Sequence, residues 1–190
     1  MILSKEELVA EFGSTFEHSP WIAEAAFEAG AFQGVARSAD GAIRLTPDEA
    51  DRIYAAMVEA FRAAPRERRM GVLTAHPDLA GRLAIADLTD DSAAEQTGAG
   101  LDRLTPGEHD RFTSLNARYA ERFGHPFIIA VRGMDRHAIL KAFERRVEND
   151  ADVEFAEACA QVERIARLRL EARVERSDAT DRCTDRCTDG

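Results

Sequence analysis

Apolar side chains recur three and four residues apart along most of this chain, a spacing that aligns them on one face of an α-helix. Ile53, Met57 and Phe61 follow this spacing, and so does the stretch between residues 105 and 124. The apolar positions of that second stretch are Phe112, Leu115, Tyr119 and Phe123. No stretch alternates apolar and polar side chains as a half-buried strand does. The pattern therefore predicts an all-α protein.

Several helix starts are marked by side chains that can cap backbone N–H groups. Ser4, Ser19, Thr46 and Thr105 each precede a proline or an acidic first turn, which is typical of a helix N-terminus. Further helices are expected from Pro77 onward and at about 89–98, 135–148 and 150–175. With about eight helix signals and no sheet, we expect a single-domain, compact helical bundle over residues 1–176.

One apolar run does not fit a helix. Residues 126–131 read PFIIAV, a composition typical of a strand, but the run is short and isolated. We expect a buried extended segment rather than part of a sheet. Its backbone N–H and C=O groups need hydrogen-bond partners, and a ligand could be one of them.

Composition and charge narrow the class of protein. The chain has 190 residues and a formal net charge of -10, with 45% hydrophobic residues. The acidic balance argues against nucleic acid or an anionic membrane as a partner. No apolar run is long enough to span a bilayer, and acidic residues stand where a signal peptide would be apolar. We expect a cytoplasmic protein.

Three cysteines do not indicate a disulfide framework. Cys159 falls within a helical pattern, whereas Cys183 and Cys187 belong to the repetitive tail TDRCTDRCTDG. This tail lacks apolar periodicity, so residues 177–190 are predicted to be disordered. Two cysteines without further ligands do not predict a metal site.

The first candidate chemistry lies between residues 75 and 101. His76 precedes Pro77, which disfavours a helical conformation at the histidine and suits the first position of a helix. Ser92, Glu95 and Gln96 have a spacing that places them on one helix face. An imidazole beside such a group suits proton transfer. The alternative is a histidine that caps a turn, next to a solvated helix face.

The second candidate is a charge on an apolar stripe. Phe155, Cys159, Val162 and Ala166 form the apolar face of the last helix, and Arg169 occupies its next position. A guanidinium on a core-facing side is costly unless it is paired. Arg169 could hold a substrate carboxylate in a pocket, or it could pair with a structural acid.

The order of several motifs resembles the 2-oxo-4-hydroxy-4-carboxy-5-ureidoimidazoline (OHCU) decarboxylase family. The resemblance covers roughly residues 3 to 172. Its motifs are FEHSPW at 16–21, HPDLAGR at 76–82, the Ser92-x-x-Glu95-Gln96 group running to Asp102, Leu115-Asn116-x-x-Tyr119, Phe123-Gly124-x-Pro126-Phe127-Ile128, Arg145-Arg146 and RLRL at 167–170.

This resemblance implies an all-helical, homodimeric enzyme of urate breakdown that converts OHCU to (S)-allantoin without a metal or organic cofactor. It implies that His76 is the catalytic acid/base and that Glu95 acts in catalysis with it. The residues that would hold the substrate are Pro77, Ser92, Ala93, Ala94, Glu95, Gln96, Phe127, Ile128, Ile129, Ala130, Val131 and Arg169.

His125 departs from the family pattern, which leads us to expect an apolar or aromatic residue there. We expect it at the surface. Two other functions remain open at this point. A hydrolase of a related ureide would activate a water molecule with His76 or Glu95, and a non-catalytic helical interaction module would use Arg169 only structurally.

Overall fold

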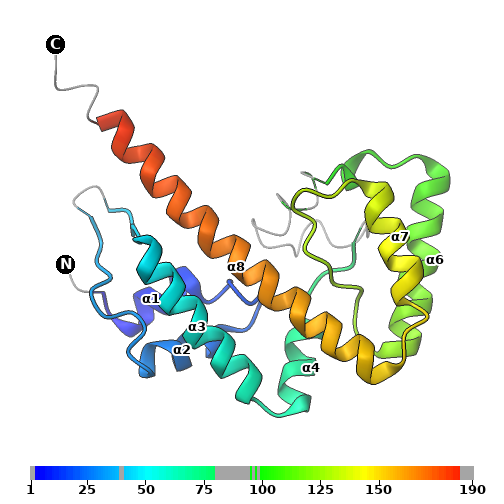
Figure 1. Ribbon diagram of the computed structural model, residues 1–190, viewed down its shortest axis with the longest axis horizontal. Helices are drawn as coiled ribbons and strands as arrows, with labels where there is room; N and C mark the ends of the chain where they lie inside the picture. Colours follow the sequence, from blue (N-terminus) through cyan, green and yellow to red (C-terminus); the bar gives the residue numbers. More distant parts are fainter. Residues whose placement is uncertain (1–2, 39–40, 80–94, 96, 98, 185–190) are drawn as a thin grey trace. The chain divides into compact units, whose positions relative to one another are not determined.

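The computed structural model describes residues 3–38, 41–79, 95, 97 and 99–184, with side chains described up to residue 174 (Figure 1). The described part contains seven α-helices and one 3-10 helix. They are α1 (Lys5–Phe12), α2 (Pro20–Glu28), α3 (Pro47–Ala63), α4 (Arg66–Thr74), η1 (Leu101–Arg103), α6 (Pro106–Phe123), α7 (Arg136–Arg146) and α8 (Ala151–Thr184). These residues form no strand, only one isolated bridge between Arg37 and Ile43. The predicted all-α class is confirmed.

The chain divides into two compact units. Residues up to Ala64 and from Ala166 onward form the first unit, and Pro65–Ile165 forms the second. The continuous helix α8 therefore contributes its N-terminal part to the second unit and its C-terminal part to the first. None of the described helices is long and apolar enough to cross a membrane.

In the first unit, α2 packs against both α1 and α3. The predicted stripe of α3 is confirmed, because Ile53, Met57 and Phe61 are all fully buried. The rings of Phe16 and Phe61 lie 5.4 Å apart between centroids. Burying an aromatic or aliphatic side chain of this size stabilises a fold by about 1.5–3 kcal/mol, so this stripe is a main source of the unit's stability.

In the second unit, α6 and α7 lie side by side (Figure 1). Aromatic side chains of both helices form a cluster with Phe127. The rings of Phe127 and Phe143 stack with centroids 3.9 Å apart. Tyr119 meets both rings edge-on, at 5.4 Å and 5.6 Å. Because Phe127 belongs to the predicted extended segment, this cluster fixes one end of that segment in the core.

The predicted caps are largely confirmed. The side chains of Ser4, Thr46 and Thr105 each accept a hydrogen bond from the backbone N–H of the glutamate three residues on. The carboxylate of that glutamate accepts from the backbone N–H of the capping residue, which completes a capping box. Ser19 makes no such side-chain bond. At Thr105, hydrogen bonds from its backbone N–H and its hydroxyl, together with Arg136, lower the pKa of Glu108 to about 2.

Two helices differ from the prediction. Helix α4 was not predicted, because its sequence RERRMGVLT carries only two buried apolar positions, Val72 and Leu73. Tertiary contacts hold it instead: the guanidinium of Arg66 lies 4.0 Å from the ring centroid of Phe155. Helix α8 continues to Thr184, beyond the predicted end at Glu175. The boundary between a domain and a tail at residue 176 stays a prediction.

The capping box of α6 yields a stability prediction. Thr105→Ala removes an acceptor from the first turn of an 18-residue helix, so the free energy of unfolding should fall by about 1 kcal/mol. Urea denaturation followed by circular dichroism measures this change. Thr105→Ser keeps the hydroxyl and should retain most of the stability; equal losses in both variants would contradict the capping explanation.

Candidate functional site

His76 lies just beyond the C-terminal end of α4. Ala75 caps that helix, and the backbone N–H of His76 still donates to the carbonyl of Leu73 at 3.2 Å. The prediction that a helix begins at Pro77 is wrong for the described residues, because Pro77 and Asp78 are irregular and Leu79 lies in a turn. His76 therefore lies at the C-terminal end of α4, where the helix dipole is negative, and not before the N-terminus of a helix that begins at Pro77.

The imidazole of His76 is buried and oriented by the backbone of α4. Its Nδ1 lies 2.9 Å from the carbonyl oxygen of Val72. Because a carbonyl oxygen only accepts hydrogen bonds, Nδ1 carries the proton. The neutral ring then has its lone pair on Nε2, so Nε2 is the nitrogen that can exchange a proton with a substrate.

A second anchor holds the chain directly after His76. The side-chain amide of Asn116, on α6, donates to the carbonyl of Leu79 at 2.8 Å. The segment from His76 to Leu79 is thus fixed at one end by α4 and at the other by α6. Both anchors are hydrogen bonds from a side chain to a backbone carbonyl, and they tie the position of the imidazole to the fold of the second unit.

Glu95 is half-buried and helical, and its backbone carbonyl accepts a hydrogen bond from the N–H of Ala99 at 3.2 Å. Gly100 follows in the left-handed conformation, with φ of 73°, which favours glycine and ends the turn. The other members of the predicted polar group, Ser92, Ala93, Ala94 and Gln96, lie outside the described residues. Their roles stay predictions.

The predicted extended segment is confirmed as buried. Its side chains are all less than 10% exposed: Phe127, Ile128, Ile129, Ala130 and Val131. Two backbone groups have partners on the helices around them. The guanidinium of Arg146 donates to the carbonyl of Ile128 at 2.7 Å, and the N–H of Ala130 donates to the side-chain oxygen of Gln161 at 3.0 Å.

Arg146 is a buried charged residue whose role the sequence did not predict. Its Nε donates to Glu154 Oε1 at 2.9 Å, and neither side chain reaches solvent. Glu154 also accepts from the hydroxyl of Tyr119 and, at 2.7 Å, from Asn149. Burial and the bond to Glu154 raise the pKa of Tyr119 well above its usual range, so its hydroxyl stays protonated.

A sequence signal for Arg146 was present. Ile139, Phe143 and Arg146 are buried on α7 at spacings of four and three. Arg146 therefore follows an apolar stripe in the same way as Arg169, and the same argument would have identified it. What the sequence could not supply is its partner.

Arg169 lies in the first unit and pairs with a buried acid. Its Nη1 donates to Glu17 Oε2 at 2.9 Å and to the carbonyl of Ser14 at 3.1 Å. Arg169 is 3% exposed and Glu17 is fully buried. Glu17 also has a positive φ of 48°, an uncommon conformation for a residue with a side chain. The sequence left open that Arg169 pairs with a structural acid, and the structure shows such a pair with Glu17.

His125 does not lie at the surface as expected. It is 3% exposed, its Nδ1 lies 2.9 Å from the carbonyl of Pro126, and its ring meets Tyr119 edge-on at 5.5 Å. Burial lowers the pKa of His125. It occupies the aromatic cluster, which explains why an apolar or aromatic residue was expected at this position.

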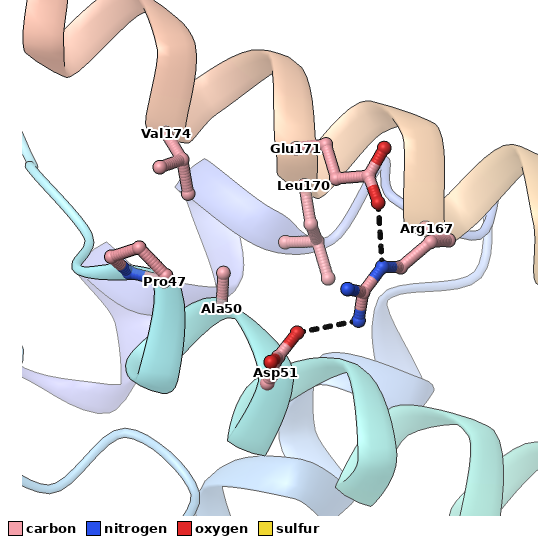
Figure 2. A pocket seen from close by; sticks show the side chains of 7 residues that line it. All are labelled: Pro47, Ala50, Asp51, Arg167, Leu170, Glu171 and Val174. Carbon is pink, nitrogen blue, oxygen red and sulfur yellow. Dashed lines mark hydrogen bonds and ion pairs between the residues drawn. The ribbon is translucent and has the colours of Figure 1, made fainter.

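A pocket of about 260 Å³ opens in the first unit between α3 and α8 (Figure 2). Its lining residues are Pro47, Ala50, Asp51, Arg167, Leu170, Glu171 and Val174. Figure 2 shows the guanidinium of Arg167 between two carboxylates, Asp51 at 2.6 Å and Glu171 at 2.8 Å. With its cation already paired and none of the predicted site residues in its lining, this pocket is not the candidate site.

The described residues define an all-helical protein whose second unit contains a buried, oriented histidine and a buried extended segment. Comparison with known proteins then gives the family. The OHCU decarboxylase family model matches residues 2–171, so the chain belongs to the OHCU decarboxylase family.

Relatives support this assignment across most of their length. A 2-oxo-4-hydroxy-4-carboxy-5-ureidoimidazoline decarboxylase of Haloferax volcanii is 39% identical over 90% of this chain and 91% of its own. A Mus musculus protein of the same name is 35% identical over 86% of this chain and 84% of its own.

Solved structures share the fold. A crystal structure of (S)-allantoin synthase matches 90% of this chain and 51% of its own, with a TM-score of 0.67 and 28% identity. An OHCU decarboxylase crystallised in the presence of (S)-allantoin matches 91% of this chain and 99% of its own, with a TM-score of 0.63. At 17% identity, the second likeness concerns the fold alone.

The ion pair of Arg169 yields a stability prediction. Glu17→Ala leaves a buried guanidinium without its carboxylate, so the free energy of unfolding should fall by about 3–5 kcal/mol. The matched control is Glu11→Ala, which removes the more exposed partner of Arg173 and should cost no more than about 1 kcal/mol. Chemical denaturation compares the two, and similar losses would contradict the importance of burial.

The buried His125 yields a pH prediction. Because its pKa is lower in the folded protein than the 6.5 of an exposed histidine, the unfolded chain binds the proton more tightly. The stability gained from a neutral His125 is thus present above about pH 6.5 and is lost as the pH falls through that value. His125→Phe should reduce the loss of stability between about pH 7.5 and about pH 5, measured by denaturation at each pH.

The control for this experiment is His137→Gln, because His137 is 71% exposed. An unchanged pH dependence in His125→Phe, or an equal change in His137→Gln, would show that other groups dominate the acid sensitivity.

Proposed function

We propose that this protein catalyses the decarboxylation of OHCU to (S)-allantoin in urate degradation. The observation that carries the proposal is the family match over residues 2–171, with relatives of that name aligned over about nine-tenths of this chain. The buried and oriented imidazole of His76 supports it, since proton transfer is the chemistry that such a reaction asks of a protein.

The substrate itself can accept the electrons of the reaction. When the C–C bond to the carboxylate breaks, CO₂ leaves and the electron pair moves into the adjoining conjugated imine. The imine nitrogen takes up a proton and the carbon that lost CO₂ is left as an enol. The enol hydroxyl then gives up its proton to become a carbonyl, while a proton is added to one face of the ring carbon that bears the ureido group. The protein has to orient the substrate, stabilise its charge and control this proton.

His76 is the proposed acid/base, acting through Nε2 because Nδ1 is held by the carbonyl of Val72. Glu95 is proposed to act with it. The remaining proposed residues hold the substrate: Pro77, Ser92, Ala93, Ala94, Gln96, residues 127–131 and Arg169, whose guanidinium suits the anionic charge. The proposed assembly is a homodimer, as the family resemblance implies, and the proposed location is the cytoplasm, as the composition of the sequence led us to expect.

The test is a coupled circular dichroism assay. OHCU is generated fresh from urate with urate oxidase and hydroxyisourate hydrolase, and this protein is then added with and without a chelator. The proposal expects rapid appearance of the (S)-allantoin signal in both cases. Only slow formation of racemic allantoin would overturn it, and release of urea or ammonia would favour hydrolysis of a related ureide.

His76→Ala tests the acid/base in the same assay. Loss of a positioned acid/base should reduce kcat by about 10²–10⁴-fold and abolish the preference for one enantiomer. His137→Ala, at an exposed histidine, should leave both unchanged. Far-ultraviolet circular dichroism checks that both variants fold, and near-normal turnover by a folded His76→Ala variant would remove His76 from the reaction.

A further inference from the structure

Hydrogen bonds from two neighbouring helices hold the backbone of residues 127–131. The carbonyl of Ile128 accepts from Arg146 at 2.7 Å, and the N–H of Ala130 donates to Gln161 at 3.0 Å. These groups belong to alternate residues.

Helix α8 carries on one face the two side chains, Glu154 and Gln161, on which the hold of the extended segment depends. Glu154, which fixes Arg146, and Gln161 are seven residues apart, or about two helical turns and about 10 Å along the axis. The first anchor reaches Ile128 through Arg146, and the second reaches Ala130 directly. A straight helix thus sets the positions of two points on an irregular segment.

The Arg146 anchor is rigid. Arg146 is fully buried, and its guanidinium lies 4.6 Å from the ring centroid of Phe127 as well as bonding to Ile128. Gln161 is only partly buried and makes a neutral hydrogen bond. Gln161 is therefore the anchor that can be altered without placing an unpaired charge in the core.

We propose that Gln161 is a positioning residue that sets the backbone of residues 127–131 for the reaction, with Arg146 as the fixed point of the same segment. This inference rests on the proposed function, which places that backbone against the substrate. Gln161 does not touch the substrate itself; it acts through Ala130. A displacement of about 1 Å in a substrate-positioning element can cost about 10²-fold in rate, so one hydrogen bond at this place has a measurable effect.

The test compares two substitutions of similar shape. Gln161→Met removes the acceptor for the N–H of Ala130, whereas Gln161→Glu keeps an acceptor oxygen at the same reach. The matched control is Arg164→Met, at an exposed position of the same helix. Each variant is assayed for kcat and KM with freshly generated OHCU, for melting temperature, and for hydrogen exchange of the Ala130 amide by NMR.

The expected result is a kcat/KM lowered at least about tenfold in Gln161→Met, with a nearly unchanged melting temperature and at least about tenfold faster exchange at Ala130. Gln161→Glu should restore most of the activity and the slow exchange, and Arg164→Met should behave as the unaltered protein. The rescue by glutamate separates positioning from general stability.

Two outcomes would overturn the proposal. Unchanged KM and kcat in Gln161→Met, with faster exchange at Ala130, would show an anchor that the reaction does not need. Slow exchange in that variant would show that Gln161 is no anchor. Absence of turnover in the unaltered protein is a different result: it would reject the proposed function, and the positioning role would fall with it, while the exchange data would still report the anchor.

Discussion

Arg146 and Glu154 are oppositely charged side chains, both fully buried in the second unit. Taking these charges out of water is costly, and the cost is offset only when every polar atom finds a partner. Here the carboxylate receives hydrogen bonds from Arg146, Tyr119 and Asn149, and the guanidinium also binds a backbone carbonyl. The pair thereby links helices α6, α7 and α8 to the extended segment.

This arrangement explains how an irregular segment can lie in a core. Residues 127–131 are buried but are not part of a helix or a sheet, so their backbone groups lack the regular partners of those structures. Arg146 and Gln161 supply two of the missing partners, and the aromatic cluster around Phe127 supplies the packing. The charged pair and the aromatic cluster therefore support the same element, which is also the wall of the proposed site.

A similar device occurs in the first unit. Arg169 follows an apolar stripe on α8, as Arg146 does on α7, and it pairs with a buried glutamate from a loop near the N-terminus. Glu17 holds the guanidinium of Arg169 in one orientation, and such an oriented guanidinium suits the substrate-binding role proposed for it. A buried arginine after an apolar stripe was in both cases a reliable sign of a specific partner.

The sequence by itself determined the elements whose signals are local. The caps at Thr46 and Thr105, the buried face of α3 and the buried run at 127–131 all follow from neighbouring residues, and all are confirmed. Proline at position 77 was also a local signal, but it misled, because the chain after α4 is held by Val72 and by Asn116 of a later helix.

Tertiary structure decided what depends on residues far apart in the chain. The partner of Arg169 is 152 residues away, and Tyr119 and Glu154 are 35 residues apart. No periodicity encodes such pairings, because they arise only when helices pack. The burial of His125, the orientation of His76 and the anchoring of Ala130 by Gln161 belong to the same class. Local chemistry thus set where most of the described helices form, with α4 as the exception, and packing set which polar groups meet.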